Sequence, residues 1–294
     1  MKEALQVLYR KGVIEEEVIK KMAGYTAADV KRLRDETDAP MMECKAALEE
    51  ANGDFDRAKE ILREKGKAAA GKKAGRATNA GAVALSASAD NKTVAGVVVE
   101  SETDFVSKNP EFVSMAQEVA DYVRDHGAPA GNAMDDPKMK EFAENIAAKF
   151  RENILIPKAV RVTSDNPIHT YLHHDKTKGT IVLAEGENAH LEGVRKVAVQ
   201  AAAFPPEVVA KEHLSQEMLE KEIEIETKRA MDEGKPENIA KNIAQGRVNK
   251  EYIKKVVLLE QPFYMDPSKS VSQHLAEEAK GAKVTDFVYL AVGA

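Results

Sequence analysis

One segment of the chain has the glycine and lysine spacing of a phosphate-binding loop. Residues 66–72 read GKAAAGK, and in nucleotide-hydrolysing enzymes such a spacing lets backbone amides surround phosphates. The following residue is Lys73, although the loop needs Ser or Thr there to hold magnesium, and no predicted strand precedes it. A basic linker is therefore the preferred interpretation. A nucleotide-hydrolysing enzyme is kept as an alternative, which an assay of intrinsic GTP binding would decide.

The histidines do not have the spacing of a known metal or catalytic motif. They are His126, His169, His173, His174, His190, His213 and His274. Adjacent side chains of a strand point to opposite faces, so we expect that His173 and His174 do not chelate one metal ion as a simple pair. His174 and Asp175 have the types of an acid–base dyad, but no activated serine or cysteine motif accompanies them. The sequence thus predicts no catalytic residue, no metal site and no cofactor.

Carboxylates and an aromatic ring stand together after a predicted buried strand. Glu100, Glu102 and Asp104 recur with a period of two, which suits either a metal site or the solvated side of a strand end, and the second is the better default. The four residues at the end of this segment are Thr103, Asp104, Phe105 and Val106. Side chains of these types on an edge loop are typical of a contact with another protein. These residues by themselves indicate a binding protein without a catalytic centre.

The composition excludes several classes of protein. Cys44 is the only cysteine, which excludes an internal disulfide and a multi-cysteine zinc or iron–sulfur site. The 43 basic and 49 acidic residues give a net charge of −6, and tryptophan is absent. A uniformly basic, base-stacking nucleic-acid surface is therefore not expected. Because we find neither a run of 18 apolar residues nor a signal peptide, we expect a cytoplasmic protein that contacts no membrane.

The elements that hold these residues begin with three predicted helices in 26–64. Thr26 and Asp29 can cap the first helix, and Gly53 can end the second in a left-handed conformation. This small bundle follows a predicted helical extension at 1–25. A flexible basic linker is predicted at 65–82, because its small, polar and basic side chains cannot offset the entropy of ordering the chain.

From residue 83 onward the hydrophobic period changes to two. Strands are predicted around 83–87, 94–99, 158–163, 168–172, 179–184 and 284–292, and helices around 110–123, 137–150, 189–203 and 270–280. Strands grouped together with helices appended indicate an α+β fold. Within 214–256 a narrow apolar stripe is interrupted by Gly234-Lys235-Pro236, which predicts an antiparallel, projecting coiled-coil hairpin.

Three separated stretches of the sequence carry distinctive motifs. The first comprises TAADVKRLR at 26–34, MMECKAAL at 41–48 and ANGD at 51–54. The second is ETDFV at 102–106, followed by Lys108 and Asn109. The third is QPF at 261–263 with DPSKSV at 266–271. Each motif is weak by itself, but their order and spacing together are specific. From about residue 26 to the end of the sequence they resemble the bacterial elongation factor Ts family.

This resemblance implies a guanine-nucleotide exchange factor, not an enzyme, that acts on elongation factor Tu during translation. The family fold implies a ubiquitin-associated-like helical domain at 26–64. It also implies two α+β core subdomains at 83–164 and 165–294, with the coiled-coil hairpin at 214–256 inserted in the second. Elongation factor Tu, in its GDP-bound and nucleotide-free forms, is the implied partner.

The resemblance also assigns roles to particular residues. By similarity, TDFV at 103–106 disturbs the magnesium site of the partner GTPase. His173 corresponds to the family's histidine at the end of a core strand, which approaches the partner's phosphate loop. Met41, Met42 and Lys45 lie where the helical domain is expected to touch the partner, and flexible methionines suit an adaptable contact.

Two alternatives to exchange activity remain. The chain can be a divergent paralogue, a reading motivated by the extension at 1–25, or an adaptor that binds a translation partner without exchange. The hairpin at 214–256 can pair two copies, contact the partner or do neither, so a homodimer and a 2:2 complex both stay open.

Overall fold

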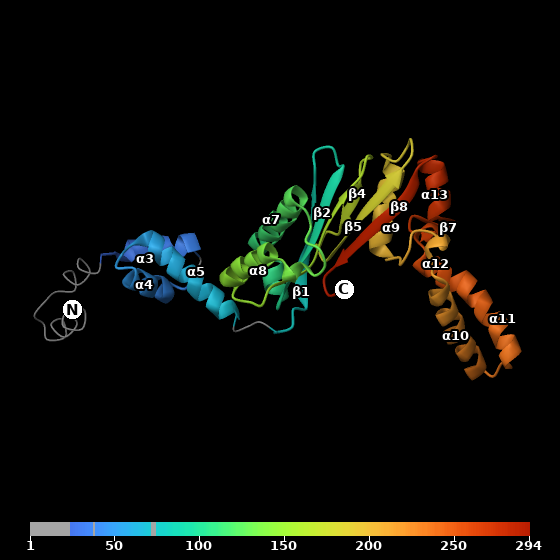
Figure 1. Ribbon diagram of the computed structural model, residues 1–294, viewed down its shortest axis with the longest axis horizontal. Coiled ribbons are helices and arrows are strands. Elements are labelled where there is room, and N and C mark those ends of the chain that lie inside the picture. Colours follow the sequence, from blue (N-terminus) through green and yellow to red (C-terminus); the bar gives the residue numbers. More distant parts are fainter. Residues whose placement is uncertain (1–23, 38, 72–74) are drawn as a thin grey trace, which may run out of the picture.

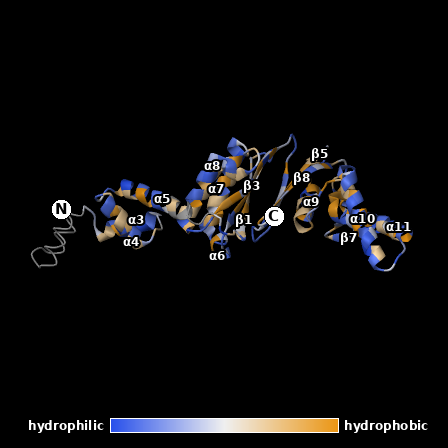
Figure 2. Cartoon of the chain, turned by 60° about the horizontal axis from the view of Figure 1, so that its bottom comes forward, coloured by the Kyte–Doolittle hydropathy of each residue, from blue (hydrophilic) through white to orange (hydrophobic). Residues whose placement is uncertain are grey.

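The molecule is elongated, with a small helical domain at one end, a mixed α and β core in the centre and a helical hairpin at the other end (Figure 1). This computed structural model describes residues 24–37, 39–71 and 75–294. Figure 2 shows the same order of parts from another direction. The extension predicted at 1–25 lies outside the described residues except for its last two positions.

The small domain consists of three helices, α3 (Ala27–Thr37), α4 (Met41–Glu50) and α5 (Phe55–Gly71). They enclose an apolar cluster that includes Leu33, Cys44, Leu48 and Ile61. The start of α3 is capped reciprocally, since the Thr26 amide donates to Asp29 and the Asp29 amide donates to the Thr26 hydroxyl. Gly53 ends α4 with φ +88°. The predicted caps are thus confirmed, whereas likeness to a ubiquitin-associated domain stays a prediction.

The linker predicted at 65–82 is wrong at both of its ends. Helix α5 continues to Gly71, and strand β1 begins at Ala80. At Gly66 an added Cβ would lie 2.9 Å from the Cβ of Ala148, so the small residue lets α5 pack closely on α8 (Pro137–Phe150). A lack of large apolar side chains was interpreted as an inability to pack, but small residues also permit close approach of two helices. Residues 72–74 lie outside the described part.

The core contains two three-stranded antiparallel sheets. The first has the order β1 (Ala80–Ala87), β2 (Thr93–Ser101), β3 (Leu155–Thr163). The second has the order β4 (His169–Leu172), β5 (Lys178–Glu185), β8 (Lys283–Ala291). The strands predicted from the period-two pattern are present within a few residues of the expected bounds, and the α+β class is confirmed.

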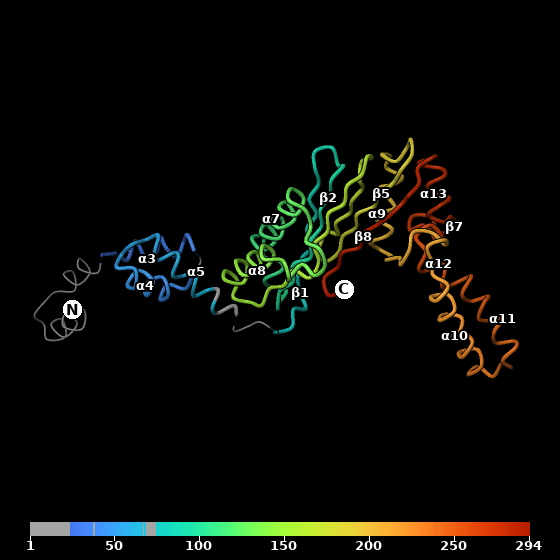
Figure 3. The backbone as a smooth tube through the Cα atoms, in the orientation of Figure 1, coloured from blue at the N-terminus to red at the C-terminus, as the bar shows by residue number. Residues whose placement is uncertain are grey.

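The inner faces of the two sheets pack on one another. Their shared apolar cluster includes Val83, Val98, Ile181 and Leu290, and β1 and β2 contact strands of the second sheet. At Gly96 a Cβ would lie 2.3 Å from Cδ1 of Leu290, so glycine allows the sheets to meet closely. The C-terminal strand returns to this central region, and the chain ends near β1 (Figure 3).

Helices cover the outer faces of the sheets. Helices α7 (Pro110–His126) and α8 (Pro137–Phe150) enclose a cluster on the first sheet around Phe112 and Ile156. Helices α9 (Glu192–Ala203) and α13 (Val271–Glu278) pack on the second sheet and on each other. Asn109 caps α7 ahead of Pro110, and Ser270 forms a capping box with Gln273 at α13. The core therefore has a helix–sheet–sheet–helix arrangement.

A helical hairpin projects from the second sheet's side of the core (Figure 1). It comprises α10 (Gln216–Asp232) and α11 (Glu237–Arg247), which continues through a π-helical turn (Val248–Tyr252) into α12 (Ile253–Val256). Alanines Ala230, Ala240 and Ala244 are fully buried between the helices. The coiled-coil character of this hairpin stays a prediction.

The remaining elements are short. They are α6 (Asp104–Ser107), β6 (Pro262–Phe263), β7 (Asp266–Ser270) and three 3-10 turns at Ala133–Asp135, Lys211–His213 and Leu258–Glu260.

Candidate functional site

The segment that follows β2 is anchored by Glu152, a residue far from it in the sequence. Thr103 has extended backbone angles, and its amide and hydroxyl donate to the two carboxylate oxygens of Glu152 at 3.0 and 2.6 Å. The Ser101 hydroxyl donates to the Thr103 carbonyl at 3.1 Å. Three hydrogen bonds therefore fix Thr103, the residue directly before the single-turn helix α6.

This anchored turn presents an aromatic ring to solvent. Phe105 is 87% exposed, whereas Val106 packs against the cluster on the first sheet. The Nζ atom of Lys108 lies 2.7 Å from a carboxylate oxygen of Asp104, and this hydrogen bond lowers the pKa of Asp104 below its usual value. The apolar ring and the charged carboxylate are neighbours on one short, exposed element.

The acidic residues before this turn have structural contacts. Glu100 accepts from the Thr78 hydroxyl at 2.8 Å and from the Gly293 amide at 3.1 Å. Glu102 accepts from the buried Asn153 amide at 2.7 Å and pairs with Arg76 at 3.4 Å. The carboxylates of Glu100 and Glu102 therefore tie the end of β2 to neighbouring segments. Because Glu100 is buried and Glu102 is only partly exposed, the preferred interpretation of a solvated strand side is wrong for these two residues, whereas Asp104 is exposed.

A dipeptide at the end of α8 connects this turn with the small helical domain. While Glu152 holds Thr103, the preceding Arg151 forms two hydrogen bonds to the Glu43 carboxylate, at 2.9 and 2.6 Å. Glu43 lies on α4, directly after two exposed methionines, Met41 at 49% and Met42 at 72%. Residues 151 and 152 thus link the methionine-bearing helix with the Phe105 turn.

Lys45 lies on the same helix and is exposed. Cys44 between Glu43 and Lys45 points into the domain core, and burial is the main reason that the pKa of its thiol is raised. A raised pKa leaves little reactive thiolate at neutral pH. Helix α4 therefore divides into a buried face with Cys44 and an outer face with the methionines and Lys45.

His173 lies in the turn after β4 and not within the strand. Strand β4 ends at Leu172, so the expectation that His173 and His174 point to opposite faces is wrong. Their ring centroids are 4.3 Å apart, because a turn does not impose the alternation of a strand. This turn lies beside β1, since the Val83 amide donates to the Lys176 carbonyl at 2.7 Å.

The His173 turn and the Phe105 turn both flank β1. Helix α6 contacts β1, and Gly81 in β1 pairs with Glu100 near the end of β2. The turn after β4 is bonded to Val83, two residues further along β1. Two predicted site segments, 70 residues apart in the sequence, are therefore brought to the same part of the core.

Comparisons with known proteins agree with this arrangement of motifs. Residues 102–294 match the family model described as elongation factor TS. Elongation factor Ts of Pasteurella multocida is 41% identical over 274 residues, covering 92% of this chain and 93% of the relative. The proteins of that name from Corynebacterium urealyticum and Aquifex aeolicus are 39% and 36% identical, covering 92% and 90% of this chain and 99% and 97% of the relatives. The chain belongs to the elongation factor Ts family.

The phosphate-loop alternative for 66–72 is not supported by the fold. Residues Gly66 to Gly71 form the last turns of α5, whereas a phosphate-binding loop connects a strand to a helix. Helical amides in this segment are used within the helix, so they cannot surround a phosphate.

Three residues that shape the site were not predicted. Glu152 and Arg151 act on partners 49 and 108 positions away in the sequence, and Tyr171 contacts His173 through a side-chain hydrogen bond of 2.9 Å. For Tyr171 the sequence offered no signal, because His173 lies past the end of β4, where the alternation of a strand is not imposed. The other two have no local signal either, because long-range pairing depends on how the helices pack.

Among the described helices, none has the length and apolar character needed to cross a membrane.

Proposed function

We propose that this chain is a guanine-nucleotide exchange factor that binds elongation factor Tu and promotes release of GDP. Family membership supports the class of function, and the 87% exposed Phe105 on an anchored turn is the observation that carries the site. A large exposed aromatic side chain is typical of a contact that is buried in a complex. In this role the chain breaks no covalent bond.

Thermodynamic linkage explains how binding alone can release a nucleotide. A GTPase holds GDP through phosphate contacts and a magnesium ion. If the chain binds the nucleotide-free state more tightly than the GDP-bound state, GDP must bind the complex more weakly by the same factor. The site therefore needs groups that fit the partner only after its magnesium and phosphate contacts have opened.

Phe105 and Asp104 have complementary chemistry for this task. The Phe105 ring would enter between helices of the partner, and burial of one such ring contributes about 2 kcal/mol. The Asp104 carboxylate would disturb the residues or waters that hold magnesium. An aspartate carboxylate is ionised at neutral pH, and the hydrogen bond from Lys108 lowers the pKa of Asp104 further. One ring is not sufficient for the whole coupling, so further contacts are required.

Two further regions are proposed as contacts. Met41, Met42 and Lys45 would form an adaptable surface on α4, and the link from Glu43 to Arg151 places this helix next to the segment that holds Thr103. His173 would approach the phosphate loop of the partner from the other side of β1. A partner that spans both turns would contact the helical domain and the core together.

The test measures release of fluorescent GDP from purified elongation factor Tu after addition of the full chain. We expect fast release at substoichiometric amounts of chain, and we expect Phe105→Ala to slow it about 30-fold, as loss of about 2 kcal/mol implies. Phe204→Ala is the matched control, because Phe204 is also exposed, at 53%, but lies outside the proposed contacts.

Each result has a defined meaning. If the unaltered chain does not speed GDP release from elongation factor Tu, exchange activity is contradicted. If the chain binds elongation factor Tu without speeding GDP release, the adaptor or the divergent paralogue is favoured. Equal rates for the unaltered chain and Phe105→Ala contradict the wedge, provided that the far-ultraviolet ellipticity of the two proteins agrees. Equal slowing by Phe204→Ala would show that the effect is not specific to the Phe105 turn.

A further inference from the structure

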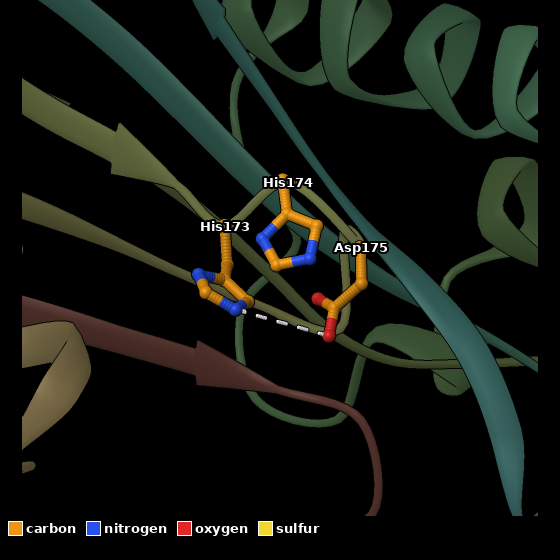
Figure 4. Close-up of side chains that lie close together, drawn as sticks. All are labelled: His173, His174 and Asp175. Atoms are coloured by element: carbon orange, nitrogen blue, oxygen red, sulfur yellow. Dashed lines mark ion pairs between the residues drawn. The ribbon is translucent and has the colours of Figure 1, made fainter.

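Three neighbouring side chains in the turn after β4 have the chemistry of a metal site. His173, His174 and Asp175 each offer a ligand atom, and these atoms all lie within 4.8 Å of one another. Figure 4 shows both imidazole rings beside the carboxylate, with the His173–Asp175 contact of 3.9 Å drawn as a dashed line. Among the described residues, no other such cluster of His, Cys, Asp and Glu is found.

The backbone of this turn is fixed from several directions. The His173 amide donates to the Lys178 carbonyl at 2.9 Å, and the Lys176 amide donates to the His173 carbonyl at 2.8 Å. Two donors outside the turn hold it as well. The Val83 amide donates to the Lys176 carbonyl at 2.7 Å, and the Val292 amide donates to the Thr177 carbonyl at 3.0 Å. Because the backbone of this segment is braced, the reorganisation needed to meet an ion is confined to rotation of the side chains.

Neighbouring groups also orient the ligands. The hydroxyl of Tyr171 lies 2.9 Å from Nδ1 of His173, so the opposite nitrogen, Nε2, is the one directed to Asp175. One carboxylate oxygen of Asp175, Oδ1, accepts from the amide and hydroxyl of Thr177 at 2.9 and 2.8 Å. The other oxygen, Oδ2, faces His173. Outer partners of this kind are typical of protein metal sites, where they fix each ligand's orientation.

The donor set selects the class of ion. Two imidazoles and one carboxylate suit zinc and its neighbours, whereas magnesium and calcium prefer oxygen ligands. We propose that His173, His174 and Asp175 bind one divalent transition-metal ion, with Zn²⁺ as the preferred ion, and leave an open coordination position. Tetrahedral zinc ligands lie about 3.4 Å apart, so the 4.8 Å spread must contract. Rotation of the exposed His174 and Asp175 side chains provides this contraction.

The open position gives the site a defined chemical capacity. Three protein ligands leave room for a water molecule or for a donor atom from another molecule. Because His173 is shared with the proposed partner surface, binding is measured on the chain without elongation factor Tu. A failure of the exchange proposal then leaves the metal result unaffected, and a failure of metal binding leaves the exchange result unaffected.

The experiment titrates Zn²⁺ into the full chain, prepared without a histidine tag, and measures heat by calorimetry. We expect one Zn²⁺ per chain and no binding of Mg²⁺ under the same conditions. Asp175→Asn should weaken binding at least about tenfold, since it removes the charge but retains an oxygen acceptor for Thr177. We expect an equal or greater loss for His174→Ala, and about tenfold for Tyr171→Phe, which removes only the orienting hydroxyl.

The matched control is His213→Ala, because His213 is also exposed but lies in the turn Lys211–His213, outside the cluster. Its affinity for Zn²⁺ should equal that of the unaltered chain. Ring-proton NMR with substoichiometric Co²⁺ gives a second readout, in which His173 and His174 signals should broaden before those of His213. Unchanged affinity in both His174→Ala and Asp175→Asn, or equal loss in His213→Ala, would overturn the proposal.

Discussion

At the scale of single residues, the turn at 103–106 exposes one side chain, Phe105, and uses its neighbours to anchor the backbone. Phe105 contacts solvent, while Thr103 and Val106 on either side are bound to Glu152 and to the core. A ring on a fixed backbone loses less entropy on binding than a ring on a free loop. Glu152 is therefore a positioning residue for the proposed contact, although it does not share the exposed surface of Phe105.

We predict that Glu152→Ala slows GDP release from elongation factor Tu about fivefold. The change removes both acceptors of Thr103, and loss of about 1 kcal/mol of positioning corresponds to that factor. Glu118→Ala is the control, because Glu118 is an exposed glutamate on α7 outside this contact. An effect of Glu152→Ala on thermal stability without an effect on release would contradict the positioning role.

At the scale of elements, local signals in the sequence predict where helices and strands lie, but they do not predict how these elements pair. The cap at Thr26 and the stop at Gly53 are local, because each depends on residues within one turn of a helix. The strands followed from a period of two, which β-branched residues in β2 make clear. These features account for why helix and strand positions could be predicted within a few residues.

The failures arose where a local pattern has two structural meanings. Small residues after Leu62 indicated a linker, yet Gly66 is the close contact of α5 with α8. Adjacent histidines indicated opposite faces, but this holds only if the strand continues past Leu172. For the candidate site, the motif at 103–106 was visible in the sequence, whereas its anchor Glu152 was not. Such pairings depend on tertiary packing, which a single sequence does not encode locally.

We predict that Gly96→Ala destabilises the core by about 1–3 kcal/mol. The new methyl group would lie 2.3 Å from Cδ1 of Leu290, 3.0 Å from Cδ2 of Leu85 and 3.3 Å from Cδ1 of Ile181, so these tightly packed side chains would have to leave their present positions. Gly246→Ala is the control, because its Cβ meets nothing within 4 Å and alanine favours the helix α11.

The measurement is urea unfolding followed by ellipticity. Gly96→Ala should lower the midpoint, while Gly246→Ala should leave it unchanged or raise it slightly. If both changes lower the midpoint equally, a general intolerance of alanine and not the contact between the sheets is responsible.

At the scale of the whole molecule, the small domain is attached to the core through α5 and through ion pairs, which include Arg63–Glu141 at 3.8 Å and Arg151–Glu43 at 2.6 Å. Helix α5 packs on α8, and Arg151 at the end of α8 is bonded to Glu43. The hydrogen bond from Arg151 is the main cause of a lowered pKa of Glu43. Both side chains are about 40% exposed, so the ion pair contributes at most about 1 kcal/mol.

We predict that Arg151→Ala increases the rate of Cys44 modification up to about fivefold at pH 7. Cys44 is the sole cysteine and is buried, so a disulfide reagent reacts only when the small domain opens. Cys44 lies in the core of the small domain, so the open state is one in which these helices separate. The Arg151–Glu43 ion pair forms only while α4 is folded and docked, so its loss lowers the free energy of that opening by up to about 1 kcal/mol and raises the open population by that factor. Arg229→Ala in the hairpin is the control and should leave the rate unchanged.

The effect of Arg151→Ala on Cys44 modification should disappear as the pH falls. Because the pKa of Glu43 is lower in the folded protein than in the unfolded chain, its stabilisation is present above the unfolded value, about 4.3. It is lost as the pH falls through the lower, folded pKa. With dithiodipyridine, which reacts at acid pH, the rates of Arg151→Ala and the unaltered chain should converge there. A ratio independent of pH would contradict the ionic origin.

The two halves of the core, which meet in the sequence near residue 164, share the apolar interface between the sheets. We therefore expect them to fold together and not as separate domains. A fragment ending near residue 164 would leave Val83 and Val98 in water, and the complementary fragment would leave Ile181 and Leu290 in water. Each half by itself is thus expected to aggregate, whereas co-expressed halves should reassemble around their common apolar seam. A chain nicked between β3 and β4 would then melt in a single calorimetric transition, as one cooperative unit.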